Sequence, residues 1–266
     1  MRLSTLRPSR LATGLLVLTA GINLAACNLQ IDNQAEARSE WKKSYTLAKG
    51  GTLEIRNTNG IIDVQPGDGD QISIVAERIA KGATDEAAKD AAEKMEIRET
   101  VSADNIILDT KMAVTGMFGG GNRQVKFHVR APRGTTLRLS NTNGAIEVSD
   151  MTGEMRLDTT NGAVKAMGIS GVTHASTTNG TVSLDFSSLP DGGMSAETTN
   201  GGVVVTIPKE SKARINARVS NGGIEADGLS LSVADQSRRR LDATVNGGGA
   251  ELRLETTNGG IRIRGR

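Results

Sequence analysis

The side chains that could do chemistry in this chain recur beside a repeated Asn-Gly turn. Seven asparagines stand between a threonine or serine and a glycine. If the repeats stack, the hydroxyl and amide groups form a strip that can hydrogen-bond a polymer such as a glycan. The candidate binding ladder is Thr142, Asn143, Thr160, Asn161, Thr178, Asn179, Thr199 and Asn200. The alternative is that these groups satisfy one another and only complete the turn.

A second chemistry that the spacing permits is glycoside hydrolysis, which uses two carboxyl groups at a defined separation. The position three residues before the turn asparagine holds Asp158 and Glu197, with Ser176 on the repeat between them. Repeats stacked about 4.8 Å apart would separate the two carboxylates by about 9.6 Å, near the upper limit for an inverting pair. A polysaccharide lyase or hydrolase is therefore the competing hypothesis. Against it, equivalent positions hold a mixture typical of a solvated face: Arg56, Ser140, Arg218 and Glu255.

The two histidines do not suggest a reaction centre. His128 and His174 lie far apart in the sequence, without the neighbouring ligands or partners that a zinc site or a nucleophilic triad needs. We therefore expect a protein that is not an enzyme, with no catalytic residue, no metal and no cofactor.

The elements that would position these residues follow from an alternation of apolar and polar side chains around each turn. In the repeat of Asn143, the apolar residues include Leu137, Leu139, Ile146 and Val148. Period-two alternation predicts one strand on either side of the turn. The turn asparagines from 143 to 221 are spaced by 18, 18, 21 and 21 residues. This near-constant length predicts an all-β fold, a parallel β-solenoid in which stacked coils share a core. A meander of stacked β-hairpins is the alternative.

Two segments depart from the repeat. Near Asn246 the apolar residues 241, 243 and 245 fit the pattern only if Gly247 takes the place of the turn asparagine. The step from Asn221 to Asn258 is 37 residues, about two coils, so the turn at 246 is expected to be a different corner. Over residues 84–94, helix-forming residues behind Thr84 predict one short helical insertion.

The N-terminus has the pattern of a secretory signal. Three arginines precede an apolar run over residues 11–24, which is too short for a membrane-spanning helix. Cys27 is the only cysteine, so it has no disulfide partner, and the sequence LAAC at 24–27 resembles the lipobox of bacterial lipoproteins. This resemblance implies cleavage before Cys27 and its acylation, which would anchor the protein to a membrane. We expect a signal peptide over 1–26, a lipidated cysteine and polar tether over 27–45, and one domain over 46–266.

The residue after the cysteine indicates which membrane. Many Gram-negative lipoproteins retained at the inner membrane carry Asp at that position, whereas this chain carries Asn28. The expected location is therefore the outer membrane, on its periplasmic or its surface face.

Charge and composition exclude one class of partner. The chain has 32 basic and 30 acidic residues, and the expected signal peptide contains three arginines and no acidic residue. The remaining 29 basic and 30 acidic residues nearly cancel, and the whole chain has only five aromatic side chains for stacking on bases. We expect no nucleic-acid partner.

Clustered arginines suggest a third class of function, an envelope sensor or regulatory protein that docks a membrane partner. The arginines are Arg238, Arg239, Arg240, Arg262, Arg264 and Arg266. Guanidinium groups suit bidentate contacts with the phosphates of anionic lipid or lipopolysaccharide. Solvated loop charges or protection of an exposed strand edge explain the same residues. The candidate partners are thus the membrane through Cys27, a glycan, or an envelope protein.

One stretch also resembles a known family. The sequence VRAPRGTTL at 129–137, leading to NTNGAI at 141–146, resembles the DUF4097 "putative adhesin" family. The upstream helix between strands and the downstream TTNG repeats extend the resemblance over about residues 46–266. It implies a solenoid-like all-β domain on exported or membrane-anchored bacterial proteins, and hence an adhesin or scaffold that presents a repetitive β surface. It supplies no catalytic residues.

Overall fold

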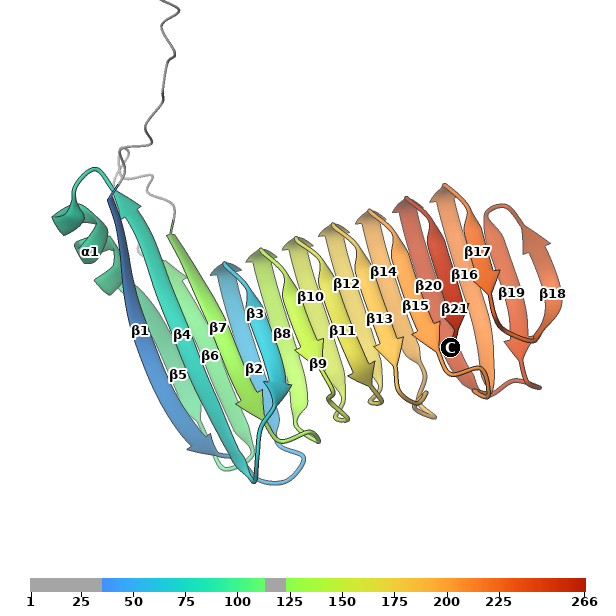
Figure 1. The fold of residues 1–266 in the computed structure, drawn as a ribbon, viewed down its shortest axis with the longest axis horizontal. Helices are drawn as coiled ribbons and strands as arrows, with labels where there is room; N and C mark the ends of the chain where they lie inside the picture. Colours follow the sequence, from blue (N-terminus) through green and yellow to red (C-terminus); the bar gives the residue numbers. More distant parts are fainter. Residues whose placement is uncertain (1–34, 113–122) are drawn as a thin grey trace, which may run out of the picture. The chain divides into compact units, whose positions relative to one another are not determined.

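The computed structural model describes residues 35–112 and 123–266, which form two facing β-sheets and one helix (Figure 1). Sheet A has ten strands, in the spatial order β1 (Ala35–Thr46), β4 (Gln71–Gly82), β7 (Arg123–Ala131), β3 (Ile62–Pro66), β9 (Ile146–Ser149), β11 (Val164–Ile169), β13 (Val182–Phe186), β15 (Val203–Ile207), β21 (Ile261–Gly265) and β17 (Ile224–Asp227). Sheet B has eleven, in the order β18 (Leu231–Ser237), β19 (Arg240–Val245), β16 (Ala213–Asn221), β20 (Ala250–Asn258), β14 (Met194–Asn200), β12 (Thr173–Asn179), β10 (Met155–Asn161), β8 (Thr136–Asn143), β2 (Thr52–Asn59), β6 (Asn105–Met112) and β5 (Met95–Val101).

Each repeat forms one coil of a solenoid. The chain runs along a strand of sheet B, turns at the Asn-Gly pair and continues along a strand of sheet A, as β10 and β11 do. Equivalent strands of neighbouring coils pair in parallel, so β10 lies between β8 and β12. The predicted parallel β-solenoid is therefore confirmed. The hairpin meander is wrong, because the two strands of one repeat lie in different sheets and do not pair with each other.

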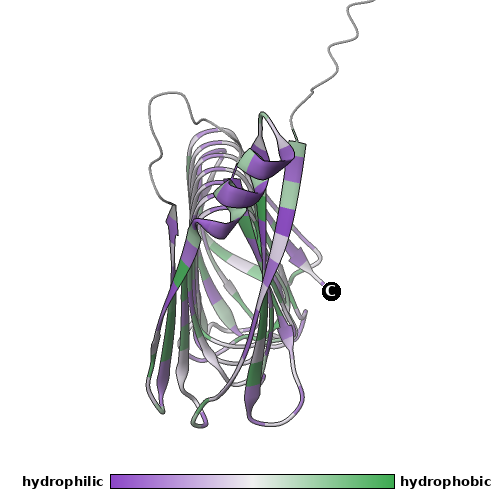
Figure 2. Cartoon of the chain, turned by 90° about the vertical axis from the view of Figure 1, so that its left-hand side faces the viewer, coloured by the Kyte–Doolittle hydropathy of each residue, from purple (hydrophilic) through white to green (hydrophobic). Residues whose placement is uncertain are grey.

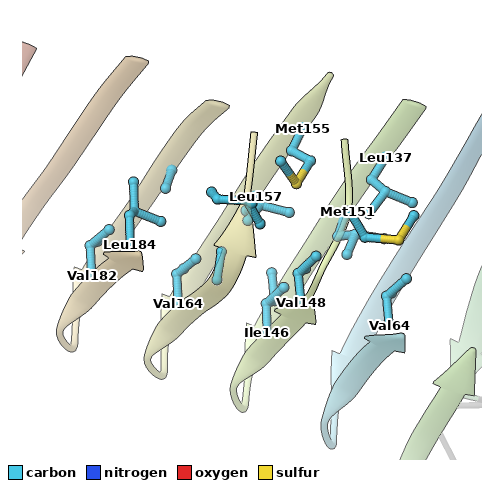
Figure 3. Close-up of a cluster of buried hydrophobic side chains, with 14 of the residues drawn as sticks. Val64, Leu137, Ile146, Val148, Met151, Met155, Leu157, Val164, Val182 and Leu184 are labelled. Carbon is cyan, nitrogen blue, oxygen red and sulfur yellow. The ribbon is translucent and has the colours of Figure 1, made fainter. Parts of the chain in front are cut away.

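The core lies between the two sheets and is built from the predicted apolar positions. Leu137 and Leu157 of sheet B, and Ile146 and Val164 of sheet A, are fully buried. Figure 3 shows such side chains pointing into the space between the sheets. Because successive residues of a strand face opposite sides, the polar residue between each apolar pair must lie on the outer surface.

Glycine at the corner is required by the close approach of neighbouring coils. A Cβ on Gly144, whose φ is 138°, would lie 1.9 Å from the backbone oxygen of Gly60. The corner backbone also links the coils, since the Gly144 N–H donates to the Asn161 oxygen at 2.8 Å. The Asn-Gly pair therefore allows tight stacking as well as the turn itself.

The coils do not stack in the order of the sequence. The C-terminal coil, β20 and β21, lies between the coil of β14 and β15 and the coil of β16 and β17. At the other end, β2 and β3 pair with β8 and β9 on one side and with β6 and β7 on the other. Two coils that are distant in sequence are therefore inserted between others.

The irregular turn at 246 has a structural cause. β18 and β19 form an antiparallel pair at the end of sheet B, and β19 also runs antiparallel to β16. The apolar residues Leu241, Ala243 and Val245 are buried as predicted. Asn246 stands at φ 49° and donates to the backbone oxygens of Lys209 and Ser211, at 2.7 and 2.9 Å. It closes a different corner, as expected from the 37-residue step.

The N-terminal end of the solenoid is covered by the predicted helix. In α1 (Asp85–Glu93), the Oγ1 atom of Thr84 accepts a hydrogen bond from the Ala87 N–H, and Ala88, Ala91 and Ala92 are buried. Figure 2, seen from this end, shows α1 lying across one opening between the sheets. The helix contacts β4 and β1, so it shields apolar residues of the first strands from water.

The predicted tether over 27–45 is wrong from residue 35 onward. Those residues form β1, which pairs along its whole length with β4. The polar residues alternate with Ala37, Trp41 and Tyr45, which pack against the core. This half-buried edge strand has a polar composition that resembles a linker. Residues 1–34, including Cys27 and the expected signal peptide, lie outside the described residues. Within the described part of the chain, no helix is long and apolar enough to span a membrane.

Candidate functional site: a polar furrow on sheet B

The three residues before each turn glycine have three different environments. In the repeats that read Thr-Thr-Asn, the first threonine faces the core and is buried. Its hydroxyl donates to the glycine oxygen of the neighbouring corner, as in Thr177 to Gly162 at 2.9 Å and Thr198 to Gly180 at 3.0 Å. This threonine satisfies a carbonyl group that the sheet ladder leaves free.

The turn asparagines bond to one another. The side-chain amide of each donates to the side-chain oxygen of the next along the stack, as in Asn179 to Asn161 at 2.8 Å and Asn200 to Asn179 at 2.9 Å. The chain of contacts also includes Asn59, Asn143, Asn258 and Asn221. For Asn143, Asn161, Asn179 and Asn200, the alternative interpretation that they complete the corner therefore accounts for their hydrogen bonds.

The second threonine of each repeat points to solvent. We call these residues the hydroxyl row: Thr142, Thr160, Thr178, Thr199, Thr257 and Ser220, in spatial order along sheet B. All are exposed, and none makes a side-chain hydrogen bond within residues 35–112 and 123–266. Among the predicted ladder residues, the threonines keep hydroxyl groups that no internal hydrogen bond uses, whereas each asparagine already uses part of its amide in the ladder.

Beside the hydroxyl row runs a mixed row, three residues before each turn asparagine. Its spatial order is Asp158, Ser176, Glu197, Glu255 and Arg218. The predicted juxtaposition of Asp158, Ser176 and Glu197 on successive coils is therefore present. Asp158 already accepts a hydrogen bond from Ser176 at 2.6 Å and pairs with Arg156 at 2.9 Å. Its carboxylate is thus held by two neighbours, whereas Glu197 is exposed and has no partner among the described residues.

Between the two rows, mainly on strands β12, β14, β20 and β16 with Thr159 of β10 at one end, the surface is hollowed into a furrow of about 670 Å³. The hydroxyl row contributes Thr178, Thr199, Thr257 and Ser220, and the mixed row contributes Ser176, Glu197, Glu255 and Arg218. Arg253 also lines it and pairs with Glu255 at 3.0 Å. No aromatic side chain is among its lining residues. The furrow therefore offers hydroxyl groups and charges to a polar ligand.

Sequence reasoning identified the positions of both rows but missed which residues are neighbours. In sequence order, the coil of Arg218 follows that of Glu197; in the structure Glu255 separates them. The insertion of β20 also brings Thr257 and Arg253 into the furrow. The 37-residue step from Asn221 to Asn258 is the signal that the sequence offers for this arrangement.

The histidines lie on different sheets. His174 of β12 is 2.9 Å from the Ser195 hydroxyl, on the outer face of sheet B. His128 of β7 is 3.4 Å from Asp63 on sheet A. No group of three or more His, Cys, Asp or Glu side chains that could hold a metal occurs in the described residues. The structure does not bring either histidine to the furrow, whose lining residues include neither.

The solved structures that are similar to this one have low sequence identity to it. A "putative cell adhesion protein" from Clostridium sporogenes is 16% identical, with a TM-score of 0.44 and coverage of 86% of this chain and 100% of its own. A "putative adhesin" from Bacteroides fragilis is 9% identical, with a TM-score of 0.31 and coverage of 85% and 97%. A "putative lipid binding protein" from Parabacteroides distasonis is 9% identical, with a TM-score of 0.30 and coverage of 86% and 97%.

The sequence itself matches no curated protein. It does match the sequence profile of a family described as Toastrack DUF4097, over residues 133–264. These residues run from β8 into β21 and include every residue that lines the furrow. The chain therefore belongs to the Toastrack DUF4097 family.

Proposed function

We propose that this chain is a non-enzymatic binding protein of the bacterial cell envelope, an adhesin or scaffold whose furrow holds a linear, hydroxyl-rich polymer such as a glycan. The observation that carries the proposal is the pair of parallel rows on sheet B, with exposed hydroxyl groups on one side and charged groups on the other. Both rows run across the strands, so the furrow follows the long direction of the coil stack.

The spacing of the rows suits a repeating ligand. Neighbouring strands lie about 4.8 Å apart, so the four strands of the furrow offer one hydroxyl group per strand over about 14 Å. Each hydroxyl can both donate and accept a hydrogen bond. Because these groups are exposed to water in the free protein, binding exchanges one set of hydrogen bonds for another, and each contact contributes only about 0.5–1.5 kcal/mol. The affinity would then come from several contacts along one polymer.

A binding role also fits the carboxylates better than hydrolysis does. An inverting glycosidase needs one carboxylic acid and one carboxylate that activates water, both free to exchange protons. Asp158 is held by Ser176 and Arg156 and does not line the furrow, although Thr159 beside it does. Glu197 lines the furrow but has Glu255, already paired with Arg253, as its neighbour on the next coil.

The direct test is polymer binding by the mature chain carrying Cys27→Ser, which removes the acylation site. The triple variant Thr178→Val, Thr199→Val and Thr257→Val replaces three furrow hydroxyls by methyl groups of similar size. Isothermal titration with neutral glucans and mannans should show affinity falling about tenfold or more, since three hydrogen bonds are lost. The matched control is Thr142→Val with Thr160→Val, in the same row outside the furrow, which should bind normally. Equal losses in both variants, or no binding of any polymer by the parent chain, would overturn the proposal.

The envelope anchor is part of the same proposal and is supported by the N-terminal sequence. Acylation of Cys27 would tie the chain to the membrane, with the outer membrane as the expected site. Intact mass and membrane fractionation of the native protein should show added acyl mass and sedimentation with outer membrane, both lost in Cys27→Ser. A native protein of unmodified mass in the soluble fraction would contradict anchoring without affecting the furrow.

A further inference from the structure

Charged side chains are distributed asymmetrically along the furrow. In spatial order its mixed row reads Ser176, Glu197, Glu255 and Arg218, and the next strand outward, β19, places Arg240 opposite Arg218. Glu197 and Arg218 are exposed, on opposite sides of Glu255. A ligand lying in the furrow therefore meets a free carboxylate toward one end and a free guanidinium group at the other.

Arg218 remains uncompensated because the nearby carboxylates are already bound. Arg253 contacts Glu255 through Nη2 at 3.0 Å and through Nε at 3.1 Å. Arg240 contacts Asp242 through Nε at 2.7 Å and Asp235 at 3.3 Å. Arg218 has no ion pair or side-chain hydrogen bond within the described ranges. Its five N–H donors can therefore take an external anion without breaking an internal bond.

The connection from β18 to β19 adds more positive charge at this end. The Val219 N–H donates to the backbone oxygen of Arg239 at 2.9 Å, which fixes the connection beside the strand that carries Arg218 and Ser220. Arg238 and Arg239 are exposed, and their guanidinium groups have no partner among residues 35–112 and 123–266. Three free guanidinium groups thus belong to the same end of the furrow.

Resting on the proposed function, we propose that the polymer is acidic, with carboxylate or phosphate groups held by Arg218 and the Arg238–Arg239 turn while its neutral part contacts the hydroxyl row. The planar guanidinium group forms paired hydrogen bonds with either kind of anion. Glu197 repels an acidic group toward the opposite end, so it fixes the direction in which the polymer lies. An anionic membrane fits less well, because Arg218 lines a hollow shared with Glu197 and Glu255 rather than a uniformly basic flat face.

The test compares ligands that differ only in charge. A polygalacturonate methyl ester with a minority of free carboxylates and its fully methyl-esterified form share a backbone, and a phosphomannan paired with unphosphorylated mannan does the same for phosphate. With the mature Cys27→Ser chain, the acidic form of at least one pair should bind about tenfold tighter, as expected for a charge-assisted contact. The preference should weaken as salt is raised, because exposed charges are screened. The pair that shows it identifies carboxylate or phosphate as the source.

Single substitutions then show which residues cause the preference for the acidic polymer. Arg218→Gln and Arg239→Gln should lower the ratio of acidic to neutral affinity toward one. Glu197→Gln should strengthen acidic binding. Arg138→Gln is the matched control, since Arg138 is an exposed arginine on the outer face of β8, outside the furrow.

The outcomes separate this inference from the proposed function. Neutral binding that depends on the furrow threonines, without acidic preference or with no effect of Arg218→Gln, overturns the acidic ligand alone. If no polymer binds, both ideas fail. If vesicles of phosphatidylglycerol bind and displace the polymer, and Arg218→Gln abolishes their binding, the arginines serve a membrane surface and the acidic-polymer inference is wrong.

Discussion

The side-chain amide of Asn161 donates a hydrogen bond of 2.9 Å to the side-chain oxygen of Asn143, and the same contact joins the turn asparagines of each neighbouring pair among the seven coils. All six contacts point toward the same end of the stack. Aligned amides polarise one another, so such a chain is stronger than its separate bonds. The ladder is therefore a stabilising device along one edge of the solenoid.

Replacing a ladder asparagine should destabilise the protein although the residue is exposed. Asn161→Ala removes the bond to Asn143 and the one accepted from Asn179 at 2.8 Å. At about 0.5–1.5 kcal/mol per bond, we expect the free energy of unfolding in urea to fall by about 1–3 kcal/mol. The adjacent Thr160→Ala should change it by less than about 0.5 kcal/mol. Equal effects of the two substitutions would show that the ladder does not contribute.

The two adjacent threonines of one repeat should respond differently to the same substitution: one variant should lose stability and the other should lose polymer binding. Thr177 is buried and donates to Gly162 at 2.9 Å, so Thr177→Val should lower the free energy of unfolding by about 1 kcal/mol. Thr178 is exposed, so Thr178→Val should leave stability unchanged and weaken only polymer binding. Urea unfolding and titration calorimetry on both variants check the division. A stability loss at 178 would mean that the hydroxyl row is structural.

Corner glycines should tolerate no side chain. In Gly144→Ala the new Cβ would lie 1.9 Å from the Gly60 oxygen, at a φ that disfavours alanine, so coils must separate at a cost of about 2–4 kcal/mol. Gly134 has no atom within 4 Å of such a Cβ and serves as the control. Gly134→Ala should be neutral or slightly stabilising. Thermal unfolding of both variants distinguishes crowding at the corner from a general cost of replacing glycine.

Removing the last coil should disturb the middle of the solenoid as well as its end. β20 separates β14 from β16, so a chain ending at residue 249 leaves both strands without a partner on one side. Hydrogen exchange should show lost protection in β14 and β16 alike, since exposed ladder amides exchange faster. Unchanged protection in both would indicate that they close on each other and that the order of coils is interchangeable.

Tyr45 provides a pH probe of the N-terminal end. Its hydroxyl donates to Glu99 of β5, and burial, followed by this contact, raises the pKa of Tyr45 above its usual value of 10. A raised pKa means that the associated stability is complete below pH 10 and is lost as the pH rises through the folded-state value. Tyr45 is the only tyrosine, so phenolate absorbance reports it alone. The midpoint should lie above 10 in the native protein and return to about 10 in urea. A native midpoint at or below the denatured one would contradict the contact.

The sequence predicts which residues of each coil are buried better than it predicts the order in which the coils stack. Alternation around each Asn-Gly pair determines which residues are buried, and the structure agrees at Leu137, Ile146 and Val164. The pattern does not determine the order of the coils, because every coil presents the same asparagine, threonine and apolar positions to its neighbours. Glu255 beside Glu197 is therefore as compatible with the pattern as Arg218 would be. Residues 35–45 were misassigned for another reason: a half-buried edge strand carries nearly the composition of a linker.

The inserted C-terminal coil also determines how the protein can be made. A solenoid whose coils follow the sequence can fold from its first coil onward while the rest is still being synthesised or exported. Here β20, which follows both β14 and β16 in the chain, has to enter between them before the stack has its native order. A nascent chain in which β20 has not yet been synthesised therefore exposes unpaired edges on β14 and β16, at which a chaperone or a protease can act.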